Sequence, residues 1–153
     1  MLEVGAKAPS FELAADGGRT VSSKALKGKA YVVYFYPRDN TPGCTTEACD
    51  FRDHFARVVA RGVEVFGVST DSVRAHDGFK AKYALPFTLL SDPAKTLHTA
   101  YGAWGVKKLY GKESEGTIRS TFLVDASGKI AAAWPKVSVK GHVEQVLAAI
   151  EAL

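Results

Sequence analysis

The sequence lacks long hydrophobic runs, a signal-like start and blocks of like charge. Its longest purely apolar run, residues 30–36, is about one strand long, whereas a membrane-spanning helix needs ~20 residues. The N-terminus contains acidic residues and no apolar stretch of signal-peptide length, so we expect a mature chain in the cytoplasm. These absences predict a soluble protein with no membrane partner.

Cysteine is also scarce, with two residues among 153, which is too few for a disulfide-stapled scaffold. No segment of about 20 to 50 residues repeats, and no Pro-rich or Gly/Ser-rich stretch marks a linker. Hydrophobic residues make up 46% of the chain, enough for a buried core. We therefore expect a single domain over residues 1–153.

Basic residues exceed acidic ones by 20 to 16, which gives a formal net charge of +4. The lysines and arginines are scattered, with no run beyond Lys107-Lys108. Binding to a phosphate backbone requires such residues on one face or arm. The sequence therefore favours no nucleic-acid partner.

Three short segments are apolar almost throughout and rich in β-branched and aromatic residues: 30–36, 63–69 and 120–125. Such segments are typical of strands buried on both faces of a sheet. Between the first two, residues 45–61 carry apolar residues at helical spacing and end before Gly62. This order predicts a βαβ unit.

The second half of the chain alternates between the same two kinds of element. Residues 72–83 are predicted to form a helix for which Asp71 and Ser72 are candidate caps and which Pro86 prevents from continuing. A short strand is expected at 87–90, and a helix from Asp92-Pro93 to about residue 101, with proline in its first turn.

The C-terminal part predicts a β-hairpin and a final helix. Ser127-Gly128 is typical of the turn between 122–125 and 129–134, and residues 140–152 have one apolar stripe. The whole pattern indicates an α/β fold, a central mixed β-sheet with helices on both faces. An initial β-α-β unit and a final hairpin with a helix are the order of the thioredoxin-like fold.

The segment PRDNTPGCTTEAC, residues 37–49, joins the first buried strand to the first long helix. Cys44 is therefore expected at or near a helix N-terminus. The unpaired N–H groups and the positive end of the helix dipole favour a thiolate over a thiol there. The position predicts a nucleophilic cysteine.

Other interpretations of the two cysteines remain open or fail on spacing. Cys44 and Cys49 could be small buried hydrophobic residues, the commonest fate of free cysteine. A metal site formed by Cys44, Cys49 and His54 is not expected. Helical residues five positions apart point about 140° apart, so the three side chains do not converge on one ion. Four residues separate the cysteines, so the two-residue spacing of a thioredoxin dithiol is absent. No metal or other cofactor is expected.

The run YFYPRDNTPGCTTEAC resembles the active-site signature of the peroxiredoxins, with Pro37, Thr41 and Cys44 in the pattern P-x-x-x-T-x-x-C. The motif T-P-G-C-T-x-E-x-C, with Cys49 at its end, resembles the peroxiredoxin Q or bacterioferritin-comigratory-protein branch. The segments FGVSTDS, FTLLSDP, YGAWG and IRSTFLVDASGKI are similar to family segments in the family order. The resemblance covers nearly the whole chain.

The resemblance implies roles for particular residues. Cys44 corresponds to the peroxidatic cysteine, Cys49 to the resolving cysteine of atypical two-cysteine members, and Arg119 to the arginine that completes the site. These roles make physical sense, because Thr41, Arg119 and the backbone around Gly43 can donate hydrogen bonds to the peroxide oxygens.

Two further residues are candidates for supporting roles. Pro37 adds bulk without a donor, so we expect it to limit water around the thiolate. Glu47, one helical turn after Cys44, is a candidate for orienting Arg119. A solvated first-turn glutamate is the alternative.

The implied function is a thiol-dependent peroxidase that reduces hydrogen peroxide and organic hydroperoxides. A Cys44 sulfenic acid would condense with Cys49 to a disulfide, which thioredoxin would reduce. A monomer is expected from the branch. The alternatives are a redox-sensing or chaperone-like protein that uses the same disulfide as a switch, and a structural domain with inert thiols.

Overall fold

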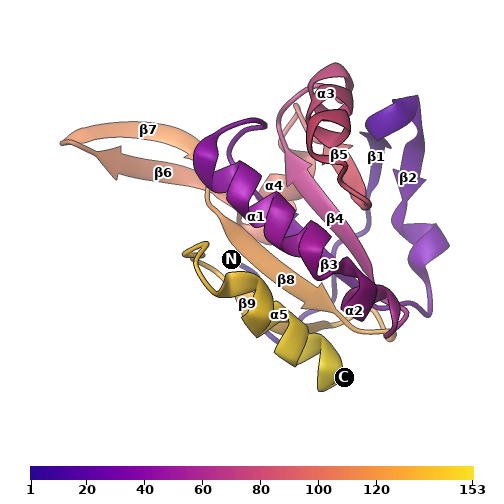
Figure 1. Cartoon of the computed structure of the whole chain (residues 1–153). Coiled ribbons are helices and arrows are strands. Elements are labelled where there is room, and N and C mark those ends of the chain that lie inside the picture. The colour runs from indigo at the N-terminus through magenta and orange to yellow at the C-terminus, as the bar shows by residue number, and fades with distance from the viewer.

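The computed structural model describes residues 1–153, apart from the side chain of Leu109. The described residues form a seven-stranded mixed sheet in the order β2-β1-β5-β4-β3-β8-β9 (Figure 1). Its strands are β1 (Glu12–Ala15), β2 (Thr20–Ser22), β3 (Tyr31–Phe35), β4 (Glu64–Ser69), β5 (Thr88–Ser91), β8 (Ser120–Val124) and β9 (Ile130–Trp134). The central strands β3, β4 and β5 are parallel, and β8 pairs antiparallel with both β3 and β9.

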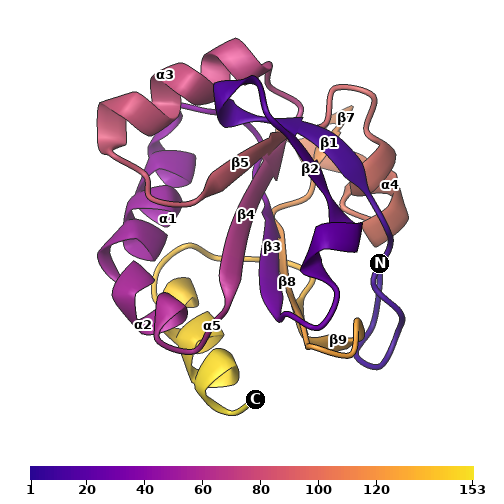
Figure 2. The same cartoon turned by 90° about the vertical axis from the view of Figure 1, so that its right-hand side faces the viewer.

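Helices cover both faces of the sheet (Figure 2). One face packs against α1 (Pro42–Asp53), α2 (Phe55–Val59), α3 (Val73–Tyr83) and α5 (His142–Glu151). The other packs against α4 (Thr96–Tyr101) and the 3-10 helix Ser23–Leu26, and a second 3-10 helix, Asp16–Gly18, joins β1 to β2. Alternate residues of β3 contribute to the two cores, as a doubly buried strand must. The expected thioredoxin-like α/β fold is confirmed.

The first long helix differs from the predicted 45–61 at both ends. It starts at Pro42, three residues earlier, because proline fits the first helical position, where its missing N–H has no intrahelical partner. It breaks at His54, whose backbone is non-helical (φ −108°, ψ 8°). The imidazole Nδ1 of His54 lies 2.8 Å from the carbonyl oxygen of Asp50, a local contact that competes with the helical ladder. The short helix α2 follows the break.

The prediction of a helix that begins at Asp92-Pro93 is also wrong at its start. Pro93 lies in a turn closed by the Lys95 N–H, which donates to the Asp92 carbonyl at 3.0 Å. α4 begins only at Thr96, and its N-terminus is capped from outside the helix. The carboxylate of Asp92 accepts the backbone N–H of His98 at 2.9 Å.

A two-stranded ribbon that the sequence did not reveal projects from the body of the protein. It consists of β6 (Trp104–Leu109) and β7 (Lys112–Thr117), joined by Tyr110 and Gly111 (Figure 1). Both turn residues have positive φ, 52° and 76°, as a type I′ hairpin turn requires. The ribbon ends at Thr117, two residues before Arg119 and three before the start of β8.

The C-terminal predictions are confirmed in outline. β8 and β9 form the expected hairpin, and α5 buries the predicted stripe: Val143, Val146, Leu147 and Ile150. Among the described residues, no helix combines the length and the apolar character that crossing a membrane requires.

Candidate active site

The connection between β3 and α1 places Cys44 in the first turn of a helix. Thr41 is the N-cap, with an extended backbone, and Pro42 is the first helical residue. The Thr45 N–H donates to the Thr41 carbonyl at 2.9 Å. The N–H groups of Gly43 and Cys44 therefore precede the helical ladder, and the positive end of the helix dipole lies beside the buried Cys44 sulfur.

Arg119 contacts Cys44 although 75 positions separate the two residues. β3 and β8 are antiparallel, with Phe35 paired to Ser120, so the end of β3 and the start of β8 share one edge of the sheet. The Nη2 atom of Arg119 donates to Cys44 Sγ at 3.2 Å. Burial lowers the pKa of Arg119, but Glu47 and Cys44 beside it raise that pKa by more, so the guanidinium stays charged.

Glu47 accepts a hydrogen bond from the other terminal nitrogen of the Arg119 guanidinium. The Nη1 atom of Arg119 donates to Glu47 Oε1 at 2.6 Å, and the glutamate is 0% exposed. Burial raises the pKa of Glu47 to about 7, while the nearby Arg119 guanidinium acts in the opposite direction. Glu47 is therefore a buried partner of Arg119 and not a solvated first-turn residue.

Gly43 leaves room for this arrangement. A Cβ atom built on Gly43 would lie 3.3 Å from Arg119 Nη2, closer than most real Cβ contacts. The absence of a side chain at this position lets the guanidinium lie against the first turn of α1. The structure thus brings together four of the predicted site residues: Gly43, Cys44, Glu47 and Arg119.

Thr41 and Pro37 lie in the loop before the helix. The Thr41 hydroxyl donates to the carbonyl oxygen of Arg38 at 2.9 Å, so its proton points into the loop and its lone pairs remain available. Pro37 is half-buried directly after Tyr36. Its action as a lid over the thiol stays a prediction.

Cys49 lies on the same continuous helix as Cys44, and both are free thiols. Cys44 is buried on the face toward the sheet, whereas Cys49 is half-buried. Residues five apart in an ideal helix have Cα atoms about 8.6 Å apart, beyond the roughly 7 Å that a disulfide tolerates. The helical form of α1 therefore holds the two thiols apart.

A buried polar network behind the loop was missed by the sequence reasoning. The carboxylate of Asp39 accepts the Tyr36 hydroxyl at 2.6 Å and lies 2.7 Å from His76 Nδ1. The other ring nitrogen of His76 lies 2.9 Å from the Leu90 carbonyl oxygen. Since both nitrogens face acceptors, His76 is an imidazolium. Burial opposes this charge, but the Asp39 carboxylate outweighs it and the pKa of His76 is raised.

The same network brings Asp39, Asp71 and His76 close enough to hold a metal ion, with their ligand atoms within 4.8 Å of one another. These atoms are already hydrogen-bonded within the network: Asp71 Oδ2 accepts the Asp39 N–H at 2.8 Å and the Ser69 hydroxyl at 2.7 Å. The cluster therefore tethers the active-site loop to α3 and carries no argument for a metal.

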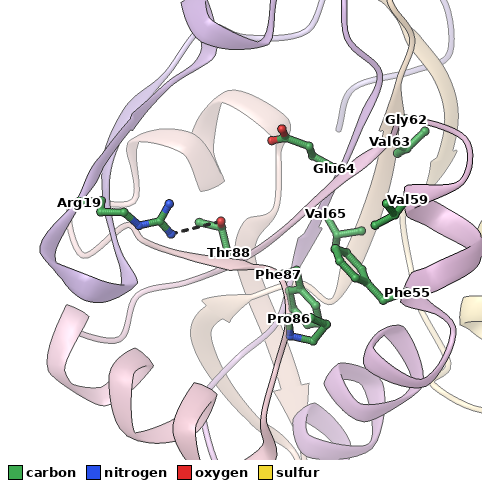
Figure 3. A pocket seen from close by; sticks show the side chains of 10 residues that line it. All are labelled: Arg19, Phe55, Val59, Gly62, Val63, Glu64, Val65, Pro86, Phe87 and Thr88. Atoms are coloured by element: carbon green, nitrogen blue, oxygen red, sulfur yellow. Dashed lines mark hydrogen bonds between the residues drawn. The ribbon is translucent and has the colours of Figure 1, made fainter.

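A shallow pocket of about 460 Å³ lies away from the thiol, where α2 meets the starts of β4 and β5 (Figure 3). Phe55, Val59 and Phe87 line it on one side, and Arg19, which reaches Thr88, on the other. Its lining includes none of the predicted site residues. The pocket is therefore separate from the cluster of predicted site residues around Cys44.

Comparison with known proteins identifies the family of the chain. The AhpC/TSA family model matches residues 4–133. A putative peroxiredoxin bcp of Coxiella burnetii is 53% identical over 146 residues, 95% of this chain and 97% of that protein. Peroxiredoxin Bcp of Bacillus subtilis is 49% identical, over 95% and 93% of the two chains.

Solved structures give the same result. Peroxiredoxin Q of Xanthomonas campestris superposes with a TM-score of 0.89 at 43% identity, over 93% of this chain and 90% of that chain. A cysteine-to-serine mutant of PrxQ from Xylella fastidiosa reaches 0.93 at 34% identity, over 99% and 97%. The X. campestris bacterioferritin comigratory protein, which superposes with a TM-score of 0.89 at 42% identity over 93% and 90%, has been solved in trapped intermediate and ligand complexes bearing on its alkyl peroxide reduction activity. The chain belongs to the AhpC/TSA family and, within it, to the peroxiredoxins of the Bcp type, which are thiol-dependent peroxidases.

Proposed function

We propose that Cys44 is the peroxidatic residue and that it reduces hydrogen peroxide and organic hydroperoxides. The observation that carries this assignment is the 3.2 Å contact between Arg119 Nη2 and Cys44 Sγ at the start of α1. A fixed guanidinium and free helix N–H groups stabilise negative charge on the sulfur and then on the departing oxygen. The alkyl peroxide reduction activity of the X. campestris relative supports organic hydroperoxides as substrates.

The first chemical step transfers one oxygen atom. The Cys44 thiolate attacks the terminal oxygen of R–O–O–H, forms the S–O bond of a sulfenic acid and breaks the O–O bond. The leaving RO⁻ takes a proton and departs as an alcohol, or as water when the substrate is hydrogen peroxide. Arg119 faces the sulfur on which this exchange occurs.

In the second step, the Cys49 thiol condenses with the Cys44 sulfenic acid to give a disulfide and water. The reaction requires the first turns of α1 to unwind, because the helix holds the two residues too far apart. Unwinding that extends to Glu47 would break its hydrogen bond to Arg119. The C-terminal half of α1 is better anchored, since Phe51 stacks on Tyr34 at 4.7 Å and Arg52 donates to the Tyr83 carbonyl at 2.8 Å.

A thiol reductant returns the enzyme to its starting state. We propose a dithiol of the thioredoxin type, which reduces the Cys44–Cys49 disulfide by exchange through a mixed disulfide. A cycle that depends on such a reductant suits a reducing, cytoplasmic location. We further propose that residues 1–153 act as one peroxiredoxin domain and as a monomer.

The test is peroxide consumption coupled to thioredoxin, thioredoxin reductase and NADPH, measured on the wild-type chain, Cys44→Ser and Cys49→Ser. We expect turnover in the wild type, none in Cys44→Ser, and a single oxidation without thioredoxin-dependent recycling in Cys49→Ser. Wild-type turnover in Cys44→Ser would show that the assignment is wrong. Stoichiometric oxidation of the wild type without turnover would favour a redox sensor.

A further inference from the structure

The two adjacent lysines of the β6–β7 ribbon lie on opposite faces of it and differ in exposure. Successive residues of a strand point to opposite faces, so Lys107 and Lys108 are on different sides of the ribbon. Lys108 is exposed, and its Nζ lies 3.5 Å from Glu113 Oε1. Lys107 is half-buried, and its strand neighbour is Ser114.

The side chain of Lys107 folds back along the ribbon toward the body of the protein. A Cβ atom built on Gly116 would lie 3.7 Å from Lys107 Cδ, 3.8 Å from Cε and 4.0 Å from Nζ. Gly116 pairs with Gly105, two positions nearer the base of the ribbon than Ser114. The lysine stem therefore crosses Gly116 in the direction of Arg119, which follows three residues later.

The charge of Lys107 is coupled to the reaction centre. Burial lowers the pKa of Lys107, and repulsion from Arg119 lowers it further, while attraction to Cys44 raises it. Arg119 itself contacts the Cys44 sulfur. The ammonium group thus lies within electrostatic range of both members of the Arg119–Cys44 pair.

We propose that Lys107 is a positioning residue for the reaction at Cys44, a second cation that the ribbon holds beside the Arg119–Cys44 pair and that stabilises negative charge there. This inference rests on the proposed role of Cys44 as the reacting thiol. The proposal also gives the ribbon a function. β6 fixes the backbone of Lys107, and the missing side chain of Gly116 leaves room for the lysine side chain.

The test compares two alkylating reagents on a chain with one thiol. In the Cys49→Ser background at low ionic strength, the rates of Cys44 with anionic iodoacetate and neutral iodoacetamide are measured. A general structural disturbance changes both rates alike, whereas loss of a nearby positive charge changes their ratio. We expect Lys107→Gln to lower the iodoacetate-to-iodoacetamide ratio about three- to tenfold, as for one partly screened charge.

Lys108→Gln is the matched control, because it removes the same charge from the next residue on the opposite face. The iodoacetate-to-iodoacetamide ratio of this variant should remain within about twofold of that of the Cys49→Ser parent. Lys107→Arg should restore the ratio. Gly116→Val obstructs the lysine stem without removing the charge, so it should also lower the iodoacetate-to-iodoacetamide ratio. This variant tests the proposal even if Lys107→Gln does not fold.

Equal ratios in Lys107→Gln and Lys108→Gln, or an unchanged ratio in Gly116→Val, would overturn the proposal. Peroxide turnover of the wild-type chain is measured separately. Absence of turnover would contradict the proposed function, whereas the alkylation ratio would still report on Lys107.

Discussion

The guanidinium of Arg119 lies directly against the backbone of Gly43, with 3.3 Å between Nη2 and the place where a Cβ would be. The same nitrogen donates to the sulfur of Cys44. The position of the cation that faces the thiol is therefore limited by a residue without a side chain. A side chain added at residue 43 would therefore press on the nitrogen that makes this hydrogen bond.

We predict that Gly43→Ala slows the reaction of Cys44 with hydrogen peroxide by about tenfold, because Arg119 must move by a few tenths of an ångström. Complete loss of such a donor typically costs about 10²- to 10³-fold, and displacement costs less. Stopped-flow mixing measures the rate. Gly78→Ala is the control, since Gly78 is an exposed helical glycine with open space around its Cβ position. Equal rates in the two variants would contradict the prediction.

A second prediction concerns Glu47→Gln, which keeps an acceptor for Arg119 but removes the charge. The pKa of Glu47 is raised to about 7, so the wild-type carboxylate is charged above that pH and neutral below it. At pH 8 we expect the variant to react with peroxide about tenfold more slowly, as for loss of a charge-assisted hydrogen bond. At pH 5.5 the two rates should converge, because the wild-type glutamate is then protonated. If the difference in rate between the wild type and Glu47→Gln were the same at both pH values, Glu47 would act by packing alone.

The pair of His76 and Asp39 predicts a pH-dependent stability. Burial opposes the charge on His76, but the Asp39 carboxylate outweighs it and raises the folded-state pKa of His76 above its usual 6.5. The stabilisation is therefore complete below pH 6.5 and is lost as pH rises through the folded-state pKa. Urea unfolding at pH 6 and pH 9 should show a larger loss of stability in the wild type than in His76→Gln. Parallel losses in both would contradict the prediction.

Two neighbouring tyrosines allow a matched comparison of buried hydroxyls. The Tyr36 hydroxyl donates to Asp39 at 2.6 Å, whereas the Tyr34 hydroxyl is buried without a partner among the described residues. We expect Tyr36→Phe to lower the free energy of unfolding by about 1 to 3 kcal/mol, because an Asp39 oxygen loses its donor. Tyr34→Phe should leave it unchanged or raise it. Urea denaturation measures both, and equal destabilisation would contradict the argument.

The last prediction is local unwinding of α1 in the oxidised protein. In the reduced form, Cys44 and Cys49 lie on one continuous helix. A disulfide between them requires that helix to open, and the first turn is where the fewest backbone bonds must break. Amide hydrogen exchange should show lower protection of residues 44–50 in the disulfide form than in the reduced form. Equal protection would exclude the unwinding.

Most of the sheet could be predicted because its strands carry their own signal. Every residue of β3 is apolar, and α5 shows a clear apolar stripe, so local sequence alone indicates burial. The β6–β7 ribbon has no such signal, since its residues are mainly polar or small and its faces are not buried in a core. The break of the first helix falls at His54, a position that no periodicity of apolar residues reveals.

The site was predictable to the extent that its residues follow one another in the chain. Cys44 is placed at a helix start by the strand-to-helix connection alone. Arg119 reaches Cys44 through the pairing of β3 with β8, so its role came from the family resemblance and not from spacing. Asp39 and His76 are 37 positions apart and polar, and only the packing of α3 against the loop brings them together.

The antiparallel pairing of β3 with β8 also bears on how the protein matures during synthesis. Cys44 leaves the ribosome long before residues 120–124, and the ladder that carries Arg119 to it closes a long loop. Until that ladder forms, the Cys44 thiol lacks the guanidinium that faces it, although Glu47 already follows it in the same helix. In a nascent chain Cys44 is therefore present without its cation, and the arrangement that we propose reacts with peroxide is complete only when the last third of the chain has folded onto the first.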